Sequence, residues 1–358
     1  MAPKQRVVVA MSGGVDSAVA AGLLARQGYD VVGITMRLWS LDDPAAPRNG
    51  RRCCSVEDTD DARRAADTIG IPHYVLNMER QFQERVVDYF VREYGRGRTP
   101  NPCLACNEHV KFRALLDRAM ALDADYLATG HYARIERAST HYRLRRAVDQ
   151  AKDQSYVLYT LGQEELRGTL FPVGAFTKPQ IRALARDLGL EIAEKPDSAD
   201  ICFVPDGDYK AFVRARIPAE PGEVRDLAGA AIGTHDGITS FTIGQRRGIG
   251  LATGEKRFVT AIDAATNVVT IGPEPALYAR ELLAEQVRWV LAPPAAPRRC
   301  DVKIRYRSPA APAVIEVRAD GAVHVRFDQP QRAITPGQAA VFYEDDEVLG
   351  GGIIAGSA

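Results

Sequence analysis

The sequence predicts an α/β protein with all-β additions: an N-terminal doubly wound parallel sheet, a small central β-rich domain and a C-terminal β-barrel. Short apolar runs alternate with amphipathic helical stretches up to about residue 130. After about residue 208, runs rich in glycine and threonine have the pattern of hairpins, and after about residue 283 short alternating strands continue along the tail. The first pattern is typical of a parallel sheet with crossover helices, and the other two are typical of antiparallel β structure.

The N-terminal sheet is predicted from four apolar runs with the length of strands: residues 7–11, 31–37, 73–78 and 126–130. Helices should connect these strands, and capping signals mark where the helices begin and end. The signals are Gly28 after the first helix, Ser55 and Gly70 at the two ends of the second, and Thr177, Pro179 and Gly189 around a later one.

The β-rich parts form two blocks. Residues 231–250 and 257–273 are expected to form hairpins. After a Pro-Ala linker, the barrel strands are expected at residues 302–307, 313–319, 322–328 and 339–354. We therefore expect three domains: residues 1–208, 209–282 and 283–358.

Composition excludes several classes of protein. The 358 residues carry 46 Lys and Arg against 46 Asp and Glu, and 46% are hydrophobic, which is an ordinary globular balance and excludes extended disorder or a collagen-like repeat. Apolar runs are shorter than the roughly 18 residues of a membrane span, and the N-terminus has no signal-peptide pattern. A cytoplasmic protein without a membrane partner is expected. Six cysteines are too few for a disulfide scaffold, so they should be buried, metal-binding or catalytic.

Two stretches, residues 134–152 and 287–307, are strongly basic although the net charge is zero. Nucleic acids respond to the local field, so these stretches are candidate phosphate contacts; the alternative is that they are solvated strand and loop faces. Their basic residues are Arg134, Arg137, Arg143, Arg145, Arg146 and Lys152 in the first stretch, and Arg288, Arg298, Arg299, Lys303, Arg305 and Arg307 in the second.

The strongest chemical signal is the loop Ser12-Gly13-Gly14-Val15-Asp16-Ser17, between the first strand and the first helix. Such a loop presents backbone N–H groups at a helix N-terminus, and its glycines allow close approach, so it should bind phosphate. It has neither the Lys-Ser/Thr ending of a Walker A loop nor dinucleotide-binding glycine spacing. Without that lysine, transfer of the terminal phosphoryl group loses a main support, and attack at the α-phosphorus becomes the alternative.

The segment from Gly95 to Asn107 is rich in turn formers and holds Cys103 and Cys106. We expect Asn107 to cap the following helix, so that Cys106 lies just outside a helix N-terminus, where the dipole favours a thiolate. Cys202 follows a charged stretch that begins at Lys195, and its environment is left open.

The Ser12–Ser17 loop resembles that of the N-type ATP pyrophosphatases, which adenylate a carbonyl oxygen. More widely, SGGVDS, GRTPNPCLACNEHVKF, ATGHYAR, KDQSYVLY, FPVG, KPDSADICF, GQRRGIG, KIRYR and TPGQAAVFY occur in the order found in the tRNA-specific 2-thiouridylases. The match runs nearly from end to end. It implies a nucleotide-binding (HUP-like) N-terminal domain and an enzyme that replaces the 2-oxygen of the wobble uridine of tRNA by sulfur.

The resemblance implies roles for individual residues. Cys106 would be the nucleophile and Cys202 the persulfide carrier. ATP and Mg²⁺ would be bound by Ala10, Met11, Ser12, Gly13, Gly14, Val15, Asp16, Ser17, Met36 and Gly130. Asn101, Pro102 and Cys103 would lie against the target base. The tRNA would be contacted by His131, Lys152, Asp153 and Gln154 in the first domain and by Arg305, Tyr306 and Gln338 in the barrel. The implied partners are tRNA and a persulfide donor, either a cysteine desulfurase or a sulfur-relay protein.

Cys103 departs from the family, because many members have an acidic residue there. The substitution creates Cys103-x-x-Cys106, which with Cys202 gives three thiolates that could hold an iron–sulfur cluster. A zinc site could be drawn by adding Cys53 or Cys54, but zinc would quench the nucleophile. We rank a persulfide and disulfide mechanism first, a cluster second and zinc third.

The implied reaction has two stages. The uridine oxygen attacks the α-phosphorus, and pyrophosphate leaves into the loop. Sulfur then arrives from the Cys202 persulfide, and Cys106 either attacks this persulfide to free hydrosulfide or resolves the product as a Cys106–Cys202 disulfide. The competing hypotheses are another adenylating enzyme, such as a small-molecule ligase, and an RNA-binding protein with a vestigial ATP loop.

Overall fold

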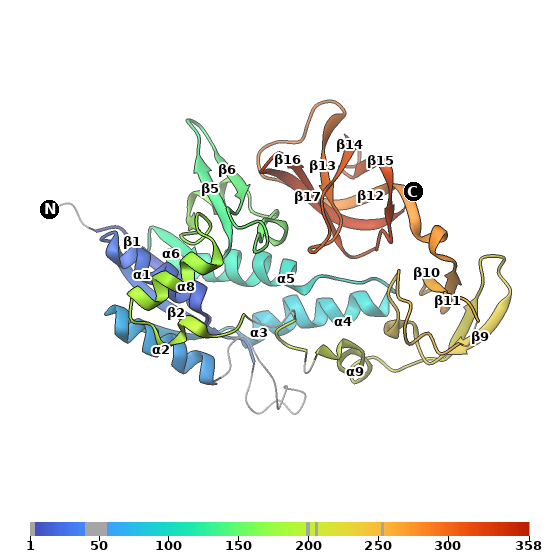
Figure 1. Ribbon diagram of the computed structural model, residues 1–358, viewed down its shortest axis with the longest axis horizontal. Coiled ribbons are helices and arrows are strands. Elements are labelled where there is room, and N and C mark those ends of the chain that lie inside the picture. Colours follow the sequence, from blue (N-terminus) through green and yellow to red (C-terminus); the bar gives the residue numbers. More distant parts are fainter. Residues whose placement is uncertain (1–3, 40–55, 198–200, 205–206, 252–253, 358) are drawn as a thin grey trace. The chain divides into compact units, whose positions relative to one another are not determined.

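The computed structural model describes residues 4–39, 56–197, 201–204, 207–251 and 254–357 (Figure 1). The chain forms two compact units. Unit 1 consists of residues 1–86, 103–207 and 346–348, and unit 2 of residues 87–102, 208–345 and 349–358. The three predicted domain ranges stay predictions.

Unit 1 is built on a parallel sheet with the strand order β3-β2-β1-β4-β7. Its strands are β1 (Arg6–Ala10), β2 (Asp30–Arg37), β3 (His73–Asn77), β4 (Tyr126–Thr129) and β7 (Thr169–Leu170). The four strands predicted from apolar runs are confirmed. β7 was not predicted, because two residues are too few to show a periodic pattern.

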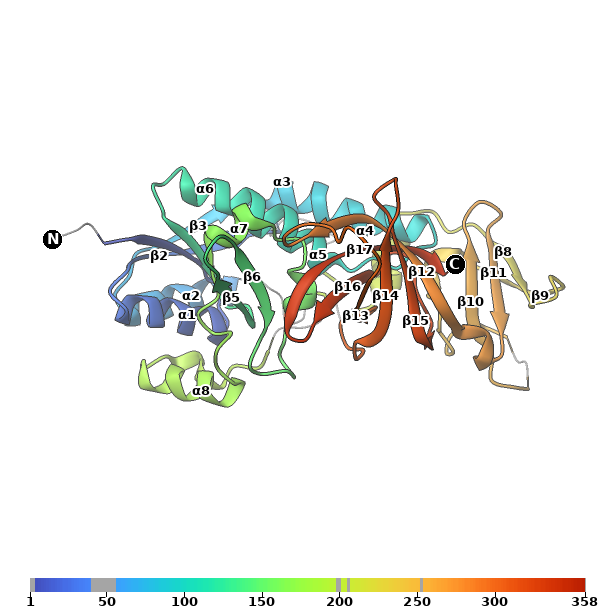
Figure 2. The ribbon, with the colours of Figure 1, turned by 90° about the horizontal axis from the view of Figure 1, so that it is seen from above.

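Helices cover both faces of this sheet, which confirms the doubly wound class. Figure 2 shows α1 (Val15–Arg26), α2 (Val56–Ile69) and α8 (Lys178–Asp187) on one side and α6 (Leu116–Met120) on the other. The core between sheet and helices is rich in Val and Ala from β1 and α1. The remaining helices of unit 1 are α3 (Glu79–Phe82), η1 (Gln83–Val87), α5 (Pro102–Ala105), η2 (Cys106–Leu115), η3 (Ser155–Val157), α7 (Gln163–Arg167) and η4 (Glu191–Glu194); η1 and α5 each include one residue of unit 2.

The helix ends predicted at Gly28, Gly70, Thr177 and Gly189 agree with the structure. Gly28, Gly70 and Gly189 follow their helices with positive φ, and Thr177 and Gln180 form a capping box at the start of α8. Ser55 lies outside the described residues.

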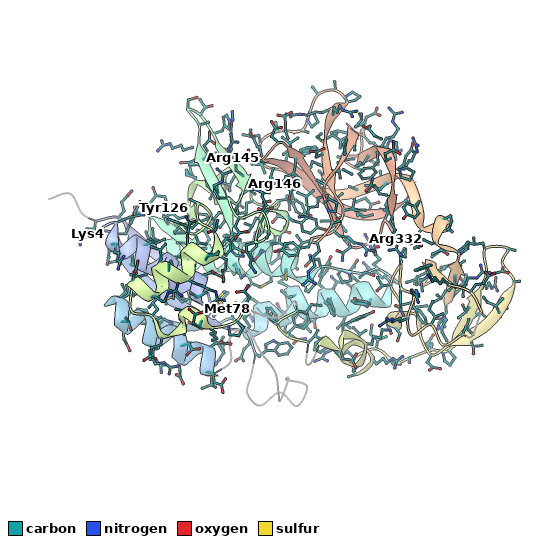
Figure 3. All side chains as sticks on the ribbon, viewed as in Figure 1. Lys4, Met78, Tyr126, Arg145, Arg146 and Arg332 are labelled. Carbon is teal, nitrogen blue, oxygen red and sulfur yellow. The ribbon has the colours of Figure 1, made fainter. Side chains whose placement is uncertain are left out.

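A hairpin of β5 (Ala133–Arg137) and β6 (Tyr142–Arg146) completes unit 1. β6 pairs with Glu347, which also belongs to unit 1. Arg145 and Arg146 extend from β6 (Figure 3).

The central part of unit 2 is a sheet with the strand order β10-β11-β8-β9. Its strands are β8 (Gly222–Arg225), β9 (Ala231–His235), β10 (Phe258–Asp263) and β11 (Val268–Gly272), accompanied by α4 (Asp88–Gly95), α9 (Tyr209–Arg214), η6 (Ile238–Ser240) and η7 (Glu274–Leu277). The predicted hairpin within residues 257–273 is confirmed as β10–β11. The hairpin predicted at 231–250 is wrong, because β9 pairs with β8, and Gly237, Gly244, Gly248 and Gly250 have positive φ that interrupts an extended strand.

The tail forms a closed six-stranded barrel with the order β12-β15-β14-β13-β16-β17, closed by pairing of β12 with β17. The strands are β12 (Tyr278–Trp289), β13 (Arg298–Lys303), β14 (Ala311–Val317), β15 (Val323–Arg332), β16 (Ala339–Glu344) and β17 (Glu347–Ser357). One predicted strand is corrected: β13 ends at Lys303, because residues 305–308 turn, with the Ser308 N–H donating to the Arg305 carbonyl at 3.2 Å. None of the described helices has the length and apolarity of a membrane span.

Candidate active site

The Ser12–Ser17 loop lies at the carboxyl end of β1, in the middle of the sheet. The chain leaves β1 toward β2 on one side, while β4 lies on the other side of β1. This reversal of strand order is a topological switch point, where α/β proteins bind ligands beyond the carboxyl ends of the strands. The loop after β1 and Gly130 after β4 therefore meet at the same crevice.

Two glycines allow this close meeting. A Cβ atom on Gly13, whose φ is +73°, would lie 2.1 Å from the carbonyl oxygen of Asp58. A Cβ atom on Gly130 would lie 2.6 Å from the backbone nitrogen of Ser17. Neither position can hold a side chain without displacing backbone, so both predicted glycines are required by the packing of the loop.

The two serines tie the loop to itself. The Ser12 N–H donates to Ser17 Oγ at 3.1 Å, and Ser17 Oγ–H donates to the Gly14 carbonyl at 3.1 Å. Below the loop, the Met11 N–H donates to the Ile34 carbonyl at 2.8 Å, which fixes the end of β1 against β2. The first-turn N–H groups of α1 have no acceptor within the helix, and such groups are suited to binding an anion.

The flanking residues are less exposed than Ser12. Met11 and Val15 are buried in the core of unit 1, and Ala10 is half-buried. Met36, predicted to border the nucleotide, is buried at the end of β2, the strand next to β1.

Charged side chains surround the loop. Lys178 Nζ lies 2.8 Å from both carboxylate oxygens of Asp16 and 2.8 Å from Asp197 Oδ1. The Tyr132 hydroxyl donates to Asp16 Oδ1 at 2.7 Å, and Lys152 Nζ donates to Asp197 Oδ2 at 2.7 Å. Burial acts to raise the pKa of Asp197, but the hydrogen bonds from Lys152 and Lys178 outweigh it and lower the pKa to about 2.

A second lysine holds the loop from its backbone. Lys195 Nζ donates to the Gly13 carbonyl at 3.0 Å, to Asp58 Oδ1 at 2.6 Å and to Asp61 Oδ2 at 2.5 Å. Sequence reasoning missed Lys178 and Lys195 as site residues. The available signals were a lysine at the first position of a capped helix and a lysine that opens the charged stretch before Cys202.

The helix that carries Cys106 begins earlier than predicted. It runs without a break from Pro102 through α5, η2 and α6, so Cys106 lies inside the helix and Asn107 is not its cap. Proline is favoured at the first helical position, and the preceding Asn101 was the overlooked capping signal. Cys103, at the second helical position, is the cysteine nearest the helix N-terminus, and it is exposed.

Neighbouring residues anchor the two other cysteines. Asn107 is buried and its Nδ2 donates to the Val157 carbonyl at 3.0 Å, which fixes the helix next to the half-buried Cys106. Cys202 lies in a turn over residues 201–204. The next residue, Phe203, packs its ring 5.7 Å from that of Phe82, so it anchors the turn.

The described residues offer no set of ligands for the iron–sulfur or zinc alternatives. Among the residues that the structure describes, no group of three or more His, Cys, Asp or Glu side chains is placed to hold a metal ion. Cys103, Cys106 and Cys202 therefore do not form a ligand set in this arrangement. Cys53 and Cys54 lie outside the described residues. Cys300 is buried in the barrel, where burial raises the pKa of its thiol to about 12.

Comparisons with known proteins identify the family. Three family models match: the tRNA methyl transferase HUP domain over residues 5–206, the tRNA methyl transferase PRC-barrel domain over residues 210–273 and the aminomethyltransferase beta-barrel domain over residues 279–354. The tRNA-specific 2-thiouridylase MnmA of Heliobacterium modesticaldum is 51% identical over 358 residues, covering 98% of this chain and 92% of that protein.

Two further relatives agree. The tRNA-specific 2-thiouridylases MnmA of Pelotomaculum thermopropionicum and Roseiflexus sp. are 49% and 50% identical, covering 98% of this chain and 97% and 99% of those proteins. The chain belongs to the tRNA-specific 2-thiouridylase family. The predicted family, fold class and enzyme class, a tRNA-uridine sulfurtransferase that uses ATP, are confirmed.

In this thiouridylase several residues expected at the tRNA are internal. His131 is buried, with Nδ1 2.6 Å from Thr129 Oγ1; burial, with the nearby charge of Lys111, lowers the pKa of His131 well below its usual range. Asp153 is also buried and accepts from the Ala147 N–H at 3.0 Å and from Ser155 Oγ at 2.8 Å.

Gln154 and Lys152 differ from each other. Gln154 Oε1 accepts from the Tyr132 backbone N–H at 2.9 Å, and the Gln154 backbone N–H donates to the Tyr132 carbonyl at 2.8 Å. Lys152 retains 40% of its side-chain exposure. Of the four residues from the first unit predicted to contact tRNA, Lys152 therefore offers the most accessible charge, and Asp153 and Gln154 shape its loop.

The residues of the C-terminal part that were predicted to contact tRNA also contact other residues of the protein. Arg305 Nη2 donates to the carbonyls of Ile243 and Ala333 and, at 2.6 Å, to Thr335 Oγ1. Gln338 Nε2 donates to the Thr99 carbonyl at 2.8 Å, close to Asn101 and Pro102 in the sequence. Tyr306 lies beside Lys303, whose Nζ is 5.7 Å from its ring centre.

Acidic partners neutralise much of the charge of both basic stretches. In the first, Arg134 and Arg145 both pair with Asp346, and Arg143 pairs with Glu347 at 3.6 Å. In the second, Arg298 pairs with Glu344 and Arg299 with Asp328. Arg307, in the same stretch, is exposed.

Proposed function

We propose that this thiouridylase adenylates the 2-oxygen of the wobble uridine (position 34) of tRNA and then replaces that oxygen with sulfur from a cysteine persulfide, releasing AMP and pyrophosphate. The observation that carries the proposal is the Ser12–Ser17 loop, an anion site at a helix N-terminus with no lysine of its own. An anion site of this kind, without the lysine that supports transfer of the terminal phosphoryl group, is suited to holding pyrophosphate as it leaves.

Adenylation is needed because an amide-like oxygen is a poor leaving group. In the proposal, the uridine oxygen attacks the α-phosphorus, and the N–H groups of the first turn of α1 stabilise the charge on the leaving pyrophosphate. Mg²⁺ is usually held by one or two carboxylates together with substrate phosphates. Asp16 fits that role, since it is the acidic side chain within the loop; the ion would neutralise phosphate charge there.

Sulfur transfer uses two cysteines. The terminal sulfur of the Cys202 persulfide attacks the adenylated carbon, and AMP leaves with the former uridine oxygen. The Cys106 thiolate then attacks Cys202 Sγ, which leaves 2-thiouridine and a Cys106–Cys202 disulfide. Two thiolates are oxidised and the sulfane sulfur is reduced, so an external thiol must reduce the disulfide before the next turnover.

The wobble base must leave its stack to reach this site, as bases do for other enzymes that modify them. The proposed partners are tRNA and a persulfide donor, a cysteine desulfurase or a sulfur-relay protein, and the proposed location is the cytoplasm. In this proposal Lys152 and the barrel residues Arg305, Tyr306 and Gln338 act on the tRNA side.

The test is a single-turnover assay with ATP, a persulfide donor and unmodified tRNA, followed by nucleoside mass analysis. Cys202→Ser and Cys106→Ser should each abolish 2-thiouridine while tRNA-dependent pyrophosphate release, which reports adenylation, continues. Cys300→Ala, in the barrel core, is the matched cysteine control and should keep thiolation. ADP and orthophosphate as products would refute adenylation, and AMP release that needs no tRNA would indicate a small-molecule ligase.

Cys103→Asp separates the persulfide mechanism from the cluster alternative. It restores the acidic residue common in the family, so thiolation should survive if Cys103 has no direct thiol role. A cluster held by three cysteines should instead lose iron, measured by metal analysis of anaerobically purified protein. If the parent protein is active without iron but Cys103→Asp is inactive without iron, both the persulfide mechanism and the cluster alternative are contradicted.

A further inference from the structure

Tyr132 joins the Ser12–Ser17 loop to the segment that carries Gln154. It lies between β4 and β5 and is 3% exposed, so its ring is fixed in the core of unit 1. Its hydroxyl donates to Asp16 Oδ1 at 2.7 Å. Its backbone N–H donates to Gln154 Oε1 at 2.9 Å, and its carbonyl accepts from the Gln154 backbone N–H at 2.8 Å. A continuous chain of contacts therefore runs from Gln154 to the first turn of α1.

The Asp16 carboxylate is held by two groups of different kinds. Lys178 Nζ lies 2.8 Å from both carboxylate oxygens, so it balances their charge without favouring either oxygen. The Tyr132 hydroxyl stands on a rigid, buried ring and bonds Oδ1, so it fixes the direction of the carboxylate. The side chain of Asp16 retains 28% of its exposure. Asp16 is thus oriented by the protein and still accessible to a ligand.

We propose that Tyr132 and Gln154 are positioning residues for Asp16, which hold its carboxylate in the direction needed for the Mg²⁺ ion that accompanies ATP. The inference rests on the proposed function, which gives Asp16 the magnesium role. Mg²⁺ demands near-ideal octahedral geometry, so a misdirected carboxylate loses affinity for it. Groups that orient a metal-binding side chain typically contribute about 10- to 100-fold to metal affinity or activity.

The inference moves Gln154 to the nucleotide side of the reaction, whereas its resemblance to the family motif implies a contact with tRNA. Its two neighbours in that motif have other partners. Lys152 is 40% exposed and pairs with Asp197. Asp153 is buried and accepts from the Ala147 and Ser155 backbone N–H groups. Gln154 instead bonds Tyr132, the residue that contacts Asp16.

The test is calorimetric titration of the α,β-methylene analogue of ATP at several Mg²⁺ concentrations. This analogue resists cleavage between the α- and β-phosphates, so binding is measured apart from the reaction. Tyr132→Phe removes the hydroxyl and keeps the ring. It should weaken binding of the magnesium complex about tenfold and raise the Mg²⁺ concentration that binding requires, with tRNA affinity nearly unchanged.

Tyr126→Phe is the matched control. Tyr126 is half-buried at the first position of β4 (Figure 3), whereas the crevice lies beyond the carboxyl end of that strand. Removal of its hydroxyl should leave the affinity for the analogue and its dependence on Mg²⁺ unchanged. A purely structural role of the Tyr132 hydroxyl would instead lower the melting temperature and weaken the analogue equally with and without Mg²⁺, which would contradict the inference.

Two variants test the other end of the chain of contacts. Gln154→Leu removes the acceptor for the Tyr132 N–H, so it should weaken the magnesium complex of the analogue about threefold or more. Gln154→Glu keeps an oxygen at this place and should restore most of the affinity. Loss of tRNA affinity alone in Gln154→Leu would overturn the assignment of Gln154.

Unchanged dependence on Mg²⁺ in both Tyr132→Phe and Gln154→Leu would overturn the inference as a whole. If the parent protein itself binds neither ATP nor the analogue, the proposed function fails instead.

Discussion

The Ser12–Ser17 loop and the two segments of unit 1 that carry Cys106 and Cys202 are held in different ways. The loop is held directly: Ser12 bonds Ser17, Lys195 bonds the Gly13 carbonyl, and Gly130 packs against Ser17. The cysteines are positioned through the residues that follow them, Asn107 after Cys106 and Phe203 after Cys202. A phosphate site gains from rigid N–H groups, whereas a sulfur that changes bonding partners during turnover is better anchored through a neighbour.

The largest effect is expected from Gly13→Ala, which should break the directly held region. The positive φ alone costs about 1–3 kcal/mol for a residue with a side chain, and the new Cβ would clash with the Asp58 carbonyl, 2.1 Å away. ATP affinity should fall at least tenfold, measured by calorimetry. Gly28→Ala is the matched control, because Gly28 also has positive φ but nothing within 4 Å of its Cβ position. Equal ATP affinity in both variants would contradict the packing argument.

Next, Asn107→Ala should loosen the Cys106 helix without touching the loop. Removing a buried amide that bonds Val157 should lower the free energy of unfolding by about 1–3 kcal/mol. Thiolation should slow several-fold more than tRNA-dependent pyrophosphate release, measured in the same reaction. Asn107→Asp keeps the shape but loses the donor, so it should behave similarly. Equal slowing of both steps would show that the anchor does not serve the cysteine specifically.

A smaller effect is expected at the tRNA. Lys152→Ala should weaken tRNA binding and lower the slope of affinity against salt by about one, since one phosphate contact is lost. Arg305→Ala should weaken tRNA binding and also lower the melting temperature, because Arg305 Nη2 bonds three acceptors within unit 2. Arg307→Ala, at an exposed position, is the control. It should change tRNA affinity, if anything, without lowering the melting temperature. Unchanged tRNA affinity in both Lys152→Ala and Arg305→Ala at physiological salt would mean that the basic stretches are solvated faces.

The smallest effect concerns His131, which follows Gly130. Its folded-state pKa is below the ordinary value of 6.5, so the unfolded chain takes up a proton first as the pH falls. Stability from this group is complete above about pH 6.5 and is lost on acidification, by at most about 1.4 kcal/mol per pH unit. His131→Gln should flatten the fall in unfolding free energy between pH 7 and pH 5. His73 and His235, whose pKa values are also lowered, will keep part of it. An unchanged slope would contradict a buried neutral ring.

The sequence predicted what depends on short spacing. The four strands, the capping glycines and the Ser12–Ser17 loop between strand and helix each follow from residues within a few positions of one another, and the structure has them. The start of the Cys106 helix was missed because Asn107 has the residue type of a helix cap, whereas the helix begins at Pro102, and proline is favoured at the first helical position.

Long-range partners were out of reach. Lys178 and Asp16 are 162 positions apart, and no local pattern shows that α8 brings one to the other. The same holds for Arg134 and Arg145, because no local pattern in their basic stretch shows that the fold brings Asp346 to both of them. The burial of His131 and Asp153 likewise depends on the packing of the whole unit.

The π-helix η2 ties the spacing of the Cys106 region to its chain length. A π-turn contains an extra residue compared with an α-turn, and such turns are frequent at functional sites. Deleting one residue between Cys106 and the buried Leu115 would let this stretch tighten to an ordinary α-helix, and residues within it would then lie on different faces of the helix. Homologous genes should therefore vary in the amino acids of this stretch while keeping its number of codons.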